Sequence, residues 1–161
     1  MRECTLPLDM PQWETLRPQE RVTLSGRVFM GGNEALNRLA YVVQEGRLTN
    51  LELEGCVWLY ALPEKLETRP WSFEPKWIRE PLPGDFFQMF RILDMSYAGI
   101  LPSDAGLPEK YGVRALVPKA EDAKLPKDAI VRVKSVWWMD QGLRSALWEV
   151  HVNQFGPFEA A

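Results

Sequence analysis

Apolar and polar residues alternate from residue 21 to residue 30, in RVTLSGRVFM, and this period of two predicts a β-strand with one buried face. Two glycines follow the strand. After them the apolar period becomes that of an α-helix, which we expect to end near Gly46. The apolar face of this helix consists of Ala35, Leu36, Leu39, Ala40 and Val43.

Further strands are predicted along the rest of the chain. Residues 53–62, LEGCVWLYAL, form a nearly continuous apolar run that suits a strand buried on both faces. Strand patterns also cover residues 113–118, 128–139 and 145–160, and the polar residues 119–127 predict a loop. A short helix is expected within residues 85–99, with an apolar side made of Phe86, Phe87, Phe90, Leu93 and Tyr97. These elements predict one mixed α/β domain over residues 1–161, with more strand than helix.

Residues 63–85 contain five prolines and four basic residues among aromatic ones. Because proline removes a backbone donor and fixes φ, we expect this segment to be a long irregular loop. Its aromatic residues Trp71, Phe73 and Trp77 are predicted to be exposed and to form an interface with another chain.

The glycine break at Gly31 and Gly32 allows two interpretations. A helix N-terminus has free backbone N–H groups and the positive end of the helix dipole, so the break suits a carboxylate or a phosphate. In the simpler interpretation the glycines only turn the chain, and Asn33 caps the helix through its side-chain oxygen. We favour the turn on spacing alone, because glycine turns before helices are common.

Composition excludes several classes of protein. The chain has 161 residues, of which 46% are hydrophobic, so it can bury a core of its own. Its net charge of -3 and its lack of a basic cluster argue against nucleic-acid binding. No apolar run approaches the ~20 residues that span a bilayer, and residues 1–13 lack the pattern of a signal peptide. We therefore expect a cytoplasmic protein that does not bind a membrane.

Residue types that bind metals are scarce. Cys4 and Cys56 are too few for a disulfide framework and form no metal-ligand motif, so no cofactor is expected in this chain itself. The single histidine, His151, lies in an alternating strand pattern and is expected to face solvent or a neighbouring strand rather than a reacting centre.

Three segments resemble the β-type domain of iron-sulfur hydro-lyases, the family of class I fumarases and L-tartrate dehydratases. They are residues 5–39, TLPLDMPQWETLRPQERVTLSGRVFMGGNEALNRL, the strand LEGCVWLYALPE, and the C-terminal VWWMDQGLRSALWEVHVNQFGPFEA. The family has the same order of a Thr-Pro-Leu lead, a short helix, a Leu-Ser-Gly strand, a loop and a helix. The resemblance covers both ends of the chain, whereas residues 63–110 match poorly.

The resemblance implies a swivelling β/β/α domain that closes over a separate α-type subunit carrying a [4Fe-4S] cluster. In such enzymes one iron acts as a Lewis acid on the substrate hydroxyl, while protein groups hold the carboxylates and remove a proton. The implied partner is therefore this α-type subunit, or a second copy of the chain in a homodimer. The loop and helix start after the Leu-Ser-Gly strand contribute to the family's dicarboxylate site.

The family's charged site residues are largely missing from this chain. Where the family has an arginine, an aspartate and a histidine in the loop and first helical turn, this chain has Gly32, Asn33 and Leu36, and only Arg38 is retained. The Gly-Pro-Thr and Thr-Ser-Gly-Arg elements are replaced by ALPEKL and LPGDFF, with Asp85 near the expected arginine, and YAGILPSDAG lacks the later Gly-Lys-Gly. A doubly anionic substrate requires fixed positive partners, so these losses predict an eroded active site.

Three functions remain open from the sequence. The chain is a hydro-lyase β subunit that works with a separate Fe-S subunit, a catalytically silent relative used for binding or assembly, or a binder of a small carboxylate. In the third case the ligand-binding residues are Gly31, Gly32, Asn33 and Arg38. The loop cations Arg69, Lys76 and Arg79 either replace the lost charges or are solvated surface residues.

Overall fold

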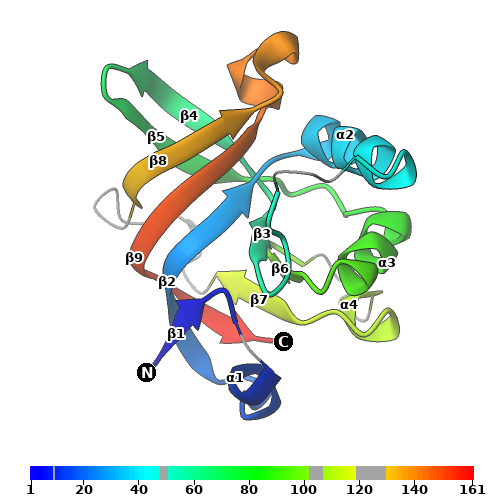
Figure 1. The fold of residues 1–161 in the computed structure, drawn as a ribbon. Helices are drawn as coiled ribbons and strands as arrows, with labels where there is room; N and C mark the ends of the chain where they lie inside the picture. The colour runs from blue at the N-terminus through cyan, green and yellow to red at the C-terminus, as the bar shows by residue number, and fades with distance from the viewer. Residues whose placement is uncertain (9, 48–50, 102–106, 119–129) are drawn as a thin grey trace.

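Five strands close into a β-barrel, and helices cover one side of it (Figure 1). The fold was obtained as a computed structural model, which describes residues 1–8, 10–47, 51–101, 107–118 and 130–161. The strands are β1 (Arg2–Leu6), β2 (Arg21–Met30), β3 (Val57–Leu59), β4 (Ala61–Thr68), β5 (Trp71–Trp77), β6 (Ser96–Ala98), β7 (Ala115–Pro118), β8 (Ile130–Trp137) and β9 (Leu147–Ala160). The helices are α1 (Met10–Glu14), α2 (Asn33–Gln44), α3 (Gly84–Ile92), α4 (Leu107–Lys110) and the short 3-10 helices η2 (Met139–Gln141) and η3 (Leu143–Ser145). The prediction of a single mixed α/β domain with more strand than helix is confirmed.

The last strand, β9, closes the barrel. Strands β2, β3, β6 and β7 are parallel neighbours in that order, and β9 pairs antiparallel with both β7 and β2. Outside the ring, β1 pairs with β2 and β8 pairs with β9. The β2–β9 pairing contains two register shifts near Gly26, and such bulges bend a strand. A Cβ atom at Gly26, where φ is +124°, would lie 2.5 Å from the carbonyl oxygen of Leu6, so only glycine fits this bend.

Alternate residues of the barrel strands face two different apolar layers. On β2, Val28 and Met30 face the barrel interior, whereas Phe29 belongs to the layer between the barrel and the helices. Trp58 of β3 faces the helices as well, and both of its neighbours on β3 face the interior. All three residues of β3 are buried, so the strand predicted over residues 53–62 is covered on both faces, but it is shorter than predicted because Ala61 and Leu62 begin β4 of a separate sheet. Period-two alternation thus separates two cores with one wall of strands.

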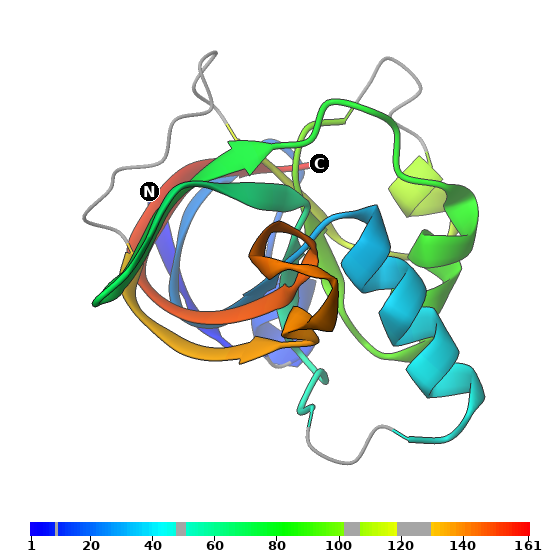
Figure 2. The same ribbon diagram turned by 90° about the horizontal axis from the view of Figure 1, so that it is seen from above.

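Residues 63–85 are not an irregular loop, and this prediction is wrong. Most of them belong to an antiparallel hairpin of β4 and β5, which lies on the opposite side of the barrel from α2 and α3 (Figure 2). Pro63 pairs with Pro75, so two prolines face each other within the two-stranded sheet. Proline is tolerated there because each strand of an isolated hairpin has an edge on which no donor is required.

The aromatic residues of the hairpin are not an exposed interface, which corrects a second prediction. Phe73 and Trp77 are buried, and Trp71 is half-buried. The rings of Phe73 and Trp71 lie 5.1 and 5.5 Å from that of Trp148 on β9. The ring of Trp77 meets Phe158 edge-on at 6.0 Å. The hairpin is therefore held by the barrel core, because burying large aromatic rings is more favourable than exposing them.

Helix α2 is confirmed, and its apolar face is buried against the barrel. It ends as expected, with Gly46 at a φ of +69°. The expected cap is wrong, since Gly32 occupies the N-cap position and the Asn33 side chain is used elsewhere. The second helix is shorter than predicted, because α3 ends at Ile92 and Tyr97 lies on β6.

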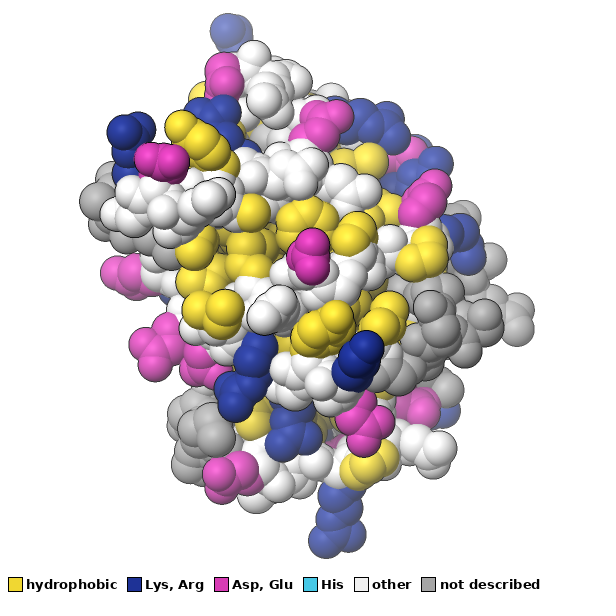
Figure 3. All heavy atoms as spheres, turned by 90° about the vertical axis from the view of Figure 1, so that its right-hand side faces the viewer, with side chains coloured by type: hydrophobic (Ala, Val, Ile, Leu, Met, Phe, Trp, Pro, Cys, Tyr) yellow, Lys and Arg dark blue, Asp and Glu magenta, His cyan; other side chains and the backbone are white. Residues whose placement is uncertain are grey.

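The helical side of the molecule exposes some hydrophobic side chains among charged ones (Figure 3). Tyr41 of α2 is 55% exposed and Ile92 of α3 is 72% exposed. In the described parts of the chain, no helix is long and apolar enough to cross a membrane. The polar loop predicted over residues 119–127 lies outside the described residues.

Candidate functional site

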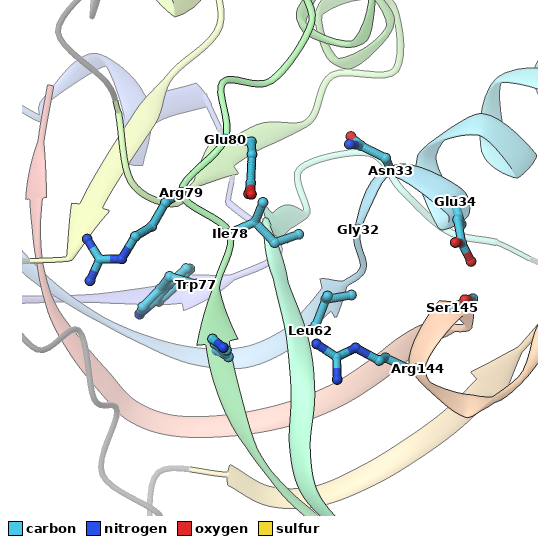
Figure 4. A pocket seen from close by; sticks show the side chains of 11 residues that line it. Gly32, Asn33, Glu34, Leu62, Trp77, Ile78, Arg79, Glu80, Arg144 and Ser145 are labelled. Atoms are coloured by element: carbon cyan, nitrogen blue, oxygen red, sulfur yellow. The ribbon is translucent and has the colours of Figure 1, made fainter.

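A pocket of about 460 Å³ lies where β2 passes into α2 (Figure 4). The start of α2 contributes Gly32, Asn33 and Glu34. The hairpin and the chain directly after it contribute Leu62, Lys76, Trp77, Ile78, Arg79 and Glu80. Helix η3 contributes Arg144 and Ser145. The pocket is thus at the carboxyl ends of parallel strands, where open α/β sheets commonly bind ligands.

The two glycines of the break have different structural roles. The indole N–H of Trp58 donates to the Gly31 carbonyl at 3.0 Å, and a Cβ at Gly31 would lie 2.7 Å from that of Ala35. Gly31 is therefore a packing residue and does not line the pocket. A Cβ at Gly32 would instead lie 3.0 Å from Leu62 Cδ2, in the pocket wall. Of the two, Gly32 is the glycine that brings backbone to the pocket.

Asn33 is oriented by a tyrosine. The hydroxyl of Tyr60 donates to Asn33 Oδ1 at 2.8 Å. Burial raises the pKa of the Tyr60 phenol, and the negative charge of Glu80 raises it further, so this hydroxyl stays protonated and remains a donor. With its oxygen occupied, Asn33 retains the amide N–H groups, for which the described residues provide no acceptor. Asn33 therefore presents donors.

The charges around the pocket are only partly paired. Lys76 forms an ion pair with Glu64 at 3.2 Å. Neither Arg79 nor Arg144 has a carboxylate partner among the described residues, and the same part of the structure gives no cation to Glu80. These side chains are exposed, so water solvates them at little cost. Their charges are consequently available to a ligand.

Two of the four ligand-binding residues predicted from the sequence line the pocket. Gly32 and Asn33 do so, whereas Gly31 packs against α2. Arg38 is not part of the lining; it forms an ion pair with Asp140 at 3.2 Å, and its guanidinium lies 5.7 Å from the ring of Trp138. Arg38 thus fastens η2 to α2, as a residue one turn into the helix is well placed to do.

Of the three cations predicted on the loop, two line the pocket and one does not. Lys76 and Arg79 line the pocket, whereas Arg69 lies at the turn between β4 and β5 and does not. Sequence reasoning missed Glu80 and Arg144. No periodicity or motif marks them, because their position depends on how the hairpin and η3 pack on the barrel.

Trp77, next to the pocket, directs its ring into the barrel core and has an unsatisfied donor. Trp77 is only 5% exposed, and its indole N–H has no hydrogen-bond acceptor among the described residues. A buried donor without an acceptor destabilises a fold by about 1–3 kcal/mol. An unsatisfied polar group in a native structure is unusual and requires an explanation.

The described residues contain no group of three or more His, Cys, Asp or Glu side chains that could hold a metal ion. Cys4 and Cys56 are both free and buried, and burial raises the pKa of each thiol. His151 is exposed on β9, as predicted. A [4Fe-4S] cluster needs several thiolate ligands close together. Cys4 lies on β1 and Cys56 directly precedes β3, so the two thiols belong to different elements of the fold.

A second group of charges lies on the outer barrel wall and is fully paired. The Glu149 carboxylate, whose side chain is 6% exposed, accepts from Arg27 at 3.1 Å and lies 3.5 Å from Lys134. Trp137 donates its indole N–H to the other oxygen of Glu149 at 3.4 Å. Arg27 also donates to the carbonyl of Glu52 at 2.9 Å.

Comparison of the sequence with protein-family models and with curated proteins finds no match.

Proposed function

We propose that this chain is a relative of the β-type domain of iron-sulfur hydro-lyases that binds a small carboxylate at the start of α2. The observation that carries the proposal is the pocket, in which Arg79 and Arg144 line the same space as the first turn of α2. Neither arginine has a carboxylate partner among the described residues.

The donors of this pocket suit a carboxylate. The first turn of a helix has backbone N–H groups without partners inside the helix, and the helix dipole favours a negative charge there. The Asn33 amide adds side-chain donors, and an arginine can bind both carboxylate oxygens at once. A volume of about 460 Å³ is also within the range of about 300–1,000 Å³ typical of small-molecule sites.

The order of elements supports the kinship. The strand with Leu24, Ser25 and Gly26 leads through the glycine break into α2, and β9 returns at the end of the chain. The family's histidine position is occupied by Leu36. This side chain lies on the buried face of α2 and cannot reach a ligand. In this proposal the carboxylate is held instead by Arg144, which comes from another part of the fold, whereas the Arg79 guanidinium points away from Asn33 (Figure 4).

A cluster-bearing α-type subunit is the second part of the proposal. The resemblance implies such a partner, and the exposed Tyr41 and Ile92 on the helical side offer it a hydrophobic surface. Anaerobic co-purification from the native cells, with iron analysis, tests this part. Recovery of the chain alone and free of iron would favour the silent binding protein.

The carboxylate site is tested by titration calorimetry with succinate. We expect binding to the wild-type chain and about tenfold weaker binding to Arg144→Gln, since about 1.4 kcal/mol corresponds to a factor of ten. The matched control is Arg69→Gln, which removes a cation outside the pocket and should leave the affinity unchanged. Asn33→Asp should also weaken binding, because it places a second negative charge beside the ligand. Failure of the wild type to bind any small carboxylate, succinate or 4-aminobutanoate, would refute the site.

A further inference from the structure

The pocket has charged groups of opposite sign at its two ends. Glu80 and Arg144 lie on opposite sides of Leu62 and Ile78 (Figure 4). From this arrangement we infer that the ligand is a small zwitterion, with its carboxylate at Arg144, its ammonium group at Glu80 and an apolar chain between them. This inference rests on the proposed function and specifies the ligand class of the same pocket.

The balance of charges favours a zwitterion over a dicarboxylate. Lys76 is neutralised by Glu64, which leaves Arg79 and Arg144 as the cations without partners among the described residues. Two carboxylates, Glu34 and Glu80, line the same pocket. A dianion requires an excess of positive charge, and it would bring its second carboxylate close to an acidic side chain.

Glu34 has a structural role that Glu80 lacks. Glu34 lies in the first turn of α2, where a negative side chain interacts favourably with the helix dipole. Glu80 follows β5 and belongs to no helix. Its charge contributes to the raised pKa of Tyr60, so the carboxylate lies near the pair formed by Tyr60 and Asn33.

Tyr60 does not satisfy the Glu80 carboxylate. Its proton is directed to Asn33, and the described residues provide no other donor or cation for Glu80. A ligand ammonium group has three N–H donors and a positive charge, and would supply what this carboxylate lacks.

The middle of the pocket is apolar. Leu62 and Ile78 project from the hairpin side toward Gly32 and the start of α2. This surface suits the methylene groups of a short chain. The ring of Trp77 packs instead in the barrel core against Phe158, so its indole N–H takes no part in this surface.

The test uses three ligands that each contain four carbon atoms and differ in their charged end groups. These are succinate with two carboxylates, 4-aminobutanoate with one carboxylate and one ammonium, and 1,4-diaminobutane with two ammonium groups. Titration calorimetry with the full chain should give 4-aminobutanoate the highest affinity, about tenfold above succinate, which corresponds to one charge-assisted interaction.

Two pocket variants and one control test which end of the pocket binds the ligand carboxylate and which binds the ammonium group. Glu80→Gln should weaken 4-aminobutanoate about tenfold and leave succinate unchanged or tighter, whereas Arg144→Gln should weaken both. Glu67→Gln, an exposed change on β4 outside the pocket, should change neither affinity. Circular dichroism and urea unfolding check that each variant is folded.

The outcomes separate this inference from the proposed function. If succinate binds as tightly as 4-aminobutanoate and Glu80→Gln has no effect, the zwitterion is wrong and the carboxylate site stands. Tightest binding of the diamine also overturns the inference. If none of the three ligands binds the wild type, both the site and its ligand class are refuted.

Discussion

The molecule holds two groups of charged side chains with opposite states of pairing. On the outer barrel wall, Glu149 contacts Arg27, Lys134 and Trp137, and Arg27 also binds the backbone. In the pocket, Arg144 and Glu80 line one space without partners from the described residues. The difference follows from exposure, because the Glu149 side chain is 6% exposed whereas the pocket side chains are largely in water.

Burial explains why the Glu149 carboxylate on the barrel wall requires a full set of cations and hydrogen-bond donors. A carboxylate removed from water loses several kcal/mol of hydration, so it is stable only when cations and donors replace the water. An exposed charge keeps its hydration and contributes little to stability with or without a partner. Paired charges on the wall therefore stabilise the fold, and unpaired charges in the pocket are free to bind a ligand.

The largest expected effect distinguishes the two groups directly. Arg27→Gln should lower the free energy of unfolding by about 3 kcal/mol, because it leaves the buried Glu149 carboxylate with only the more exposed Lys134 as a cation. The matched change Arg144→Gln should alter it by less than about 0.5 kcal/mol. Urea denaturation measures both.

Equal losses of unfolding free energy in Arg27→Gln and Arg144→Gln would contradict the distinction between paired wall charges and unpaired pocket charges. A large loss from Arg144→Gln would mean that the pocket arginine supports the fold, and a small loss from Arg27→Gln would mean that Lys134 and Trp137 are sufficient partners for Glu149. Glu149→Gln provides the complementary control, since it removes the buried charge itself.

Most strands of the barrel and helix α2 could be predicted from the sequence because their pattern is local, whereas β6 was expected to belong to the helix predicted within residues 85–99. Period two predicted β2 and the apolar run predicted β3, although Val28, Phe29 and Met30 bury both faces of β2 and β3 covers only part of the predicted run. The hairpin was missed because proline usually excludes strands, and a two-stranded sheet without further neighbours escapes that rule.

Only the local part of the site was predictable. Gly32 and Asn33 follow from the strand-to-helix break, which lies within a few residues of sequence. Arg38 was chosen because the family resemblance retains an arginine there, and a resemblance in sequence does not tell that its side chain pairs with Asp140 outside the pocket. Glu80 and Arg144 reach the pocket only through tertiary packing, and a single sequence contains no signal for that.

Gly31 and Gly32 extend the comparison between the packed part of the fold and the pocket, with smaller expected changes in stability. Gly31→Ala should cost about 2 kcal/mol, since its Cβ would lie 2.7 Å from Ala35 Cβ on a rigid helix. Gly32→Ala should cost under about 1 kcal/mol, because the ends of Leu62 and Ile78 can move away. Thermal or urea unfolding gives the stabilities, and the same pair reports on binding, since only Gly32→Ala narrows the pocket. Greater destabilisation by Gly32→Ala would reverse these roles.

The smallest expected effect concerns Tyr60, which links the fold to the pocket. Tyr60→Phe removes the hydrogen bond to Asn33 and should cost about 1 kcal/mol at neutral pH. The pKa of Tyr60 is raised in the folded chain, so its contribution is complete below the unfolded value of about 10 and is lost as pH rises toward the folded pKa. The stability difference between wild type and variant should therefore shrink above about pH 10. Tyr97, whose pKa burial also raises, is present in both chains and cancels in this difference. A difference that grows with alkaline pH would show that the folded state favours the Tyr60 phenolate, and Asn33 would then no longer be held as a donor.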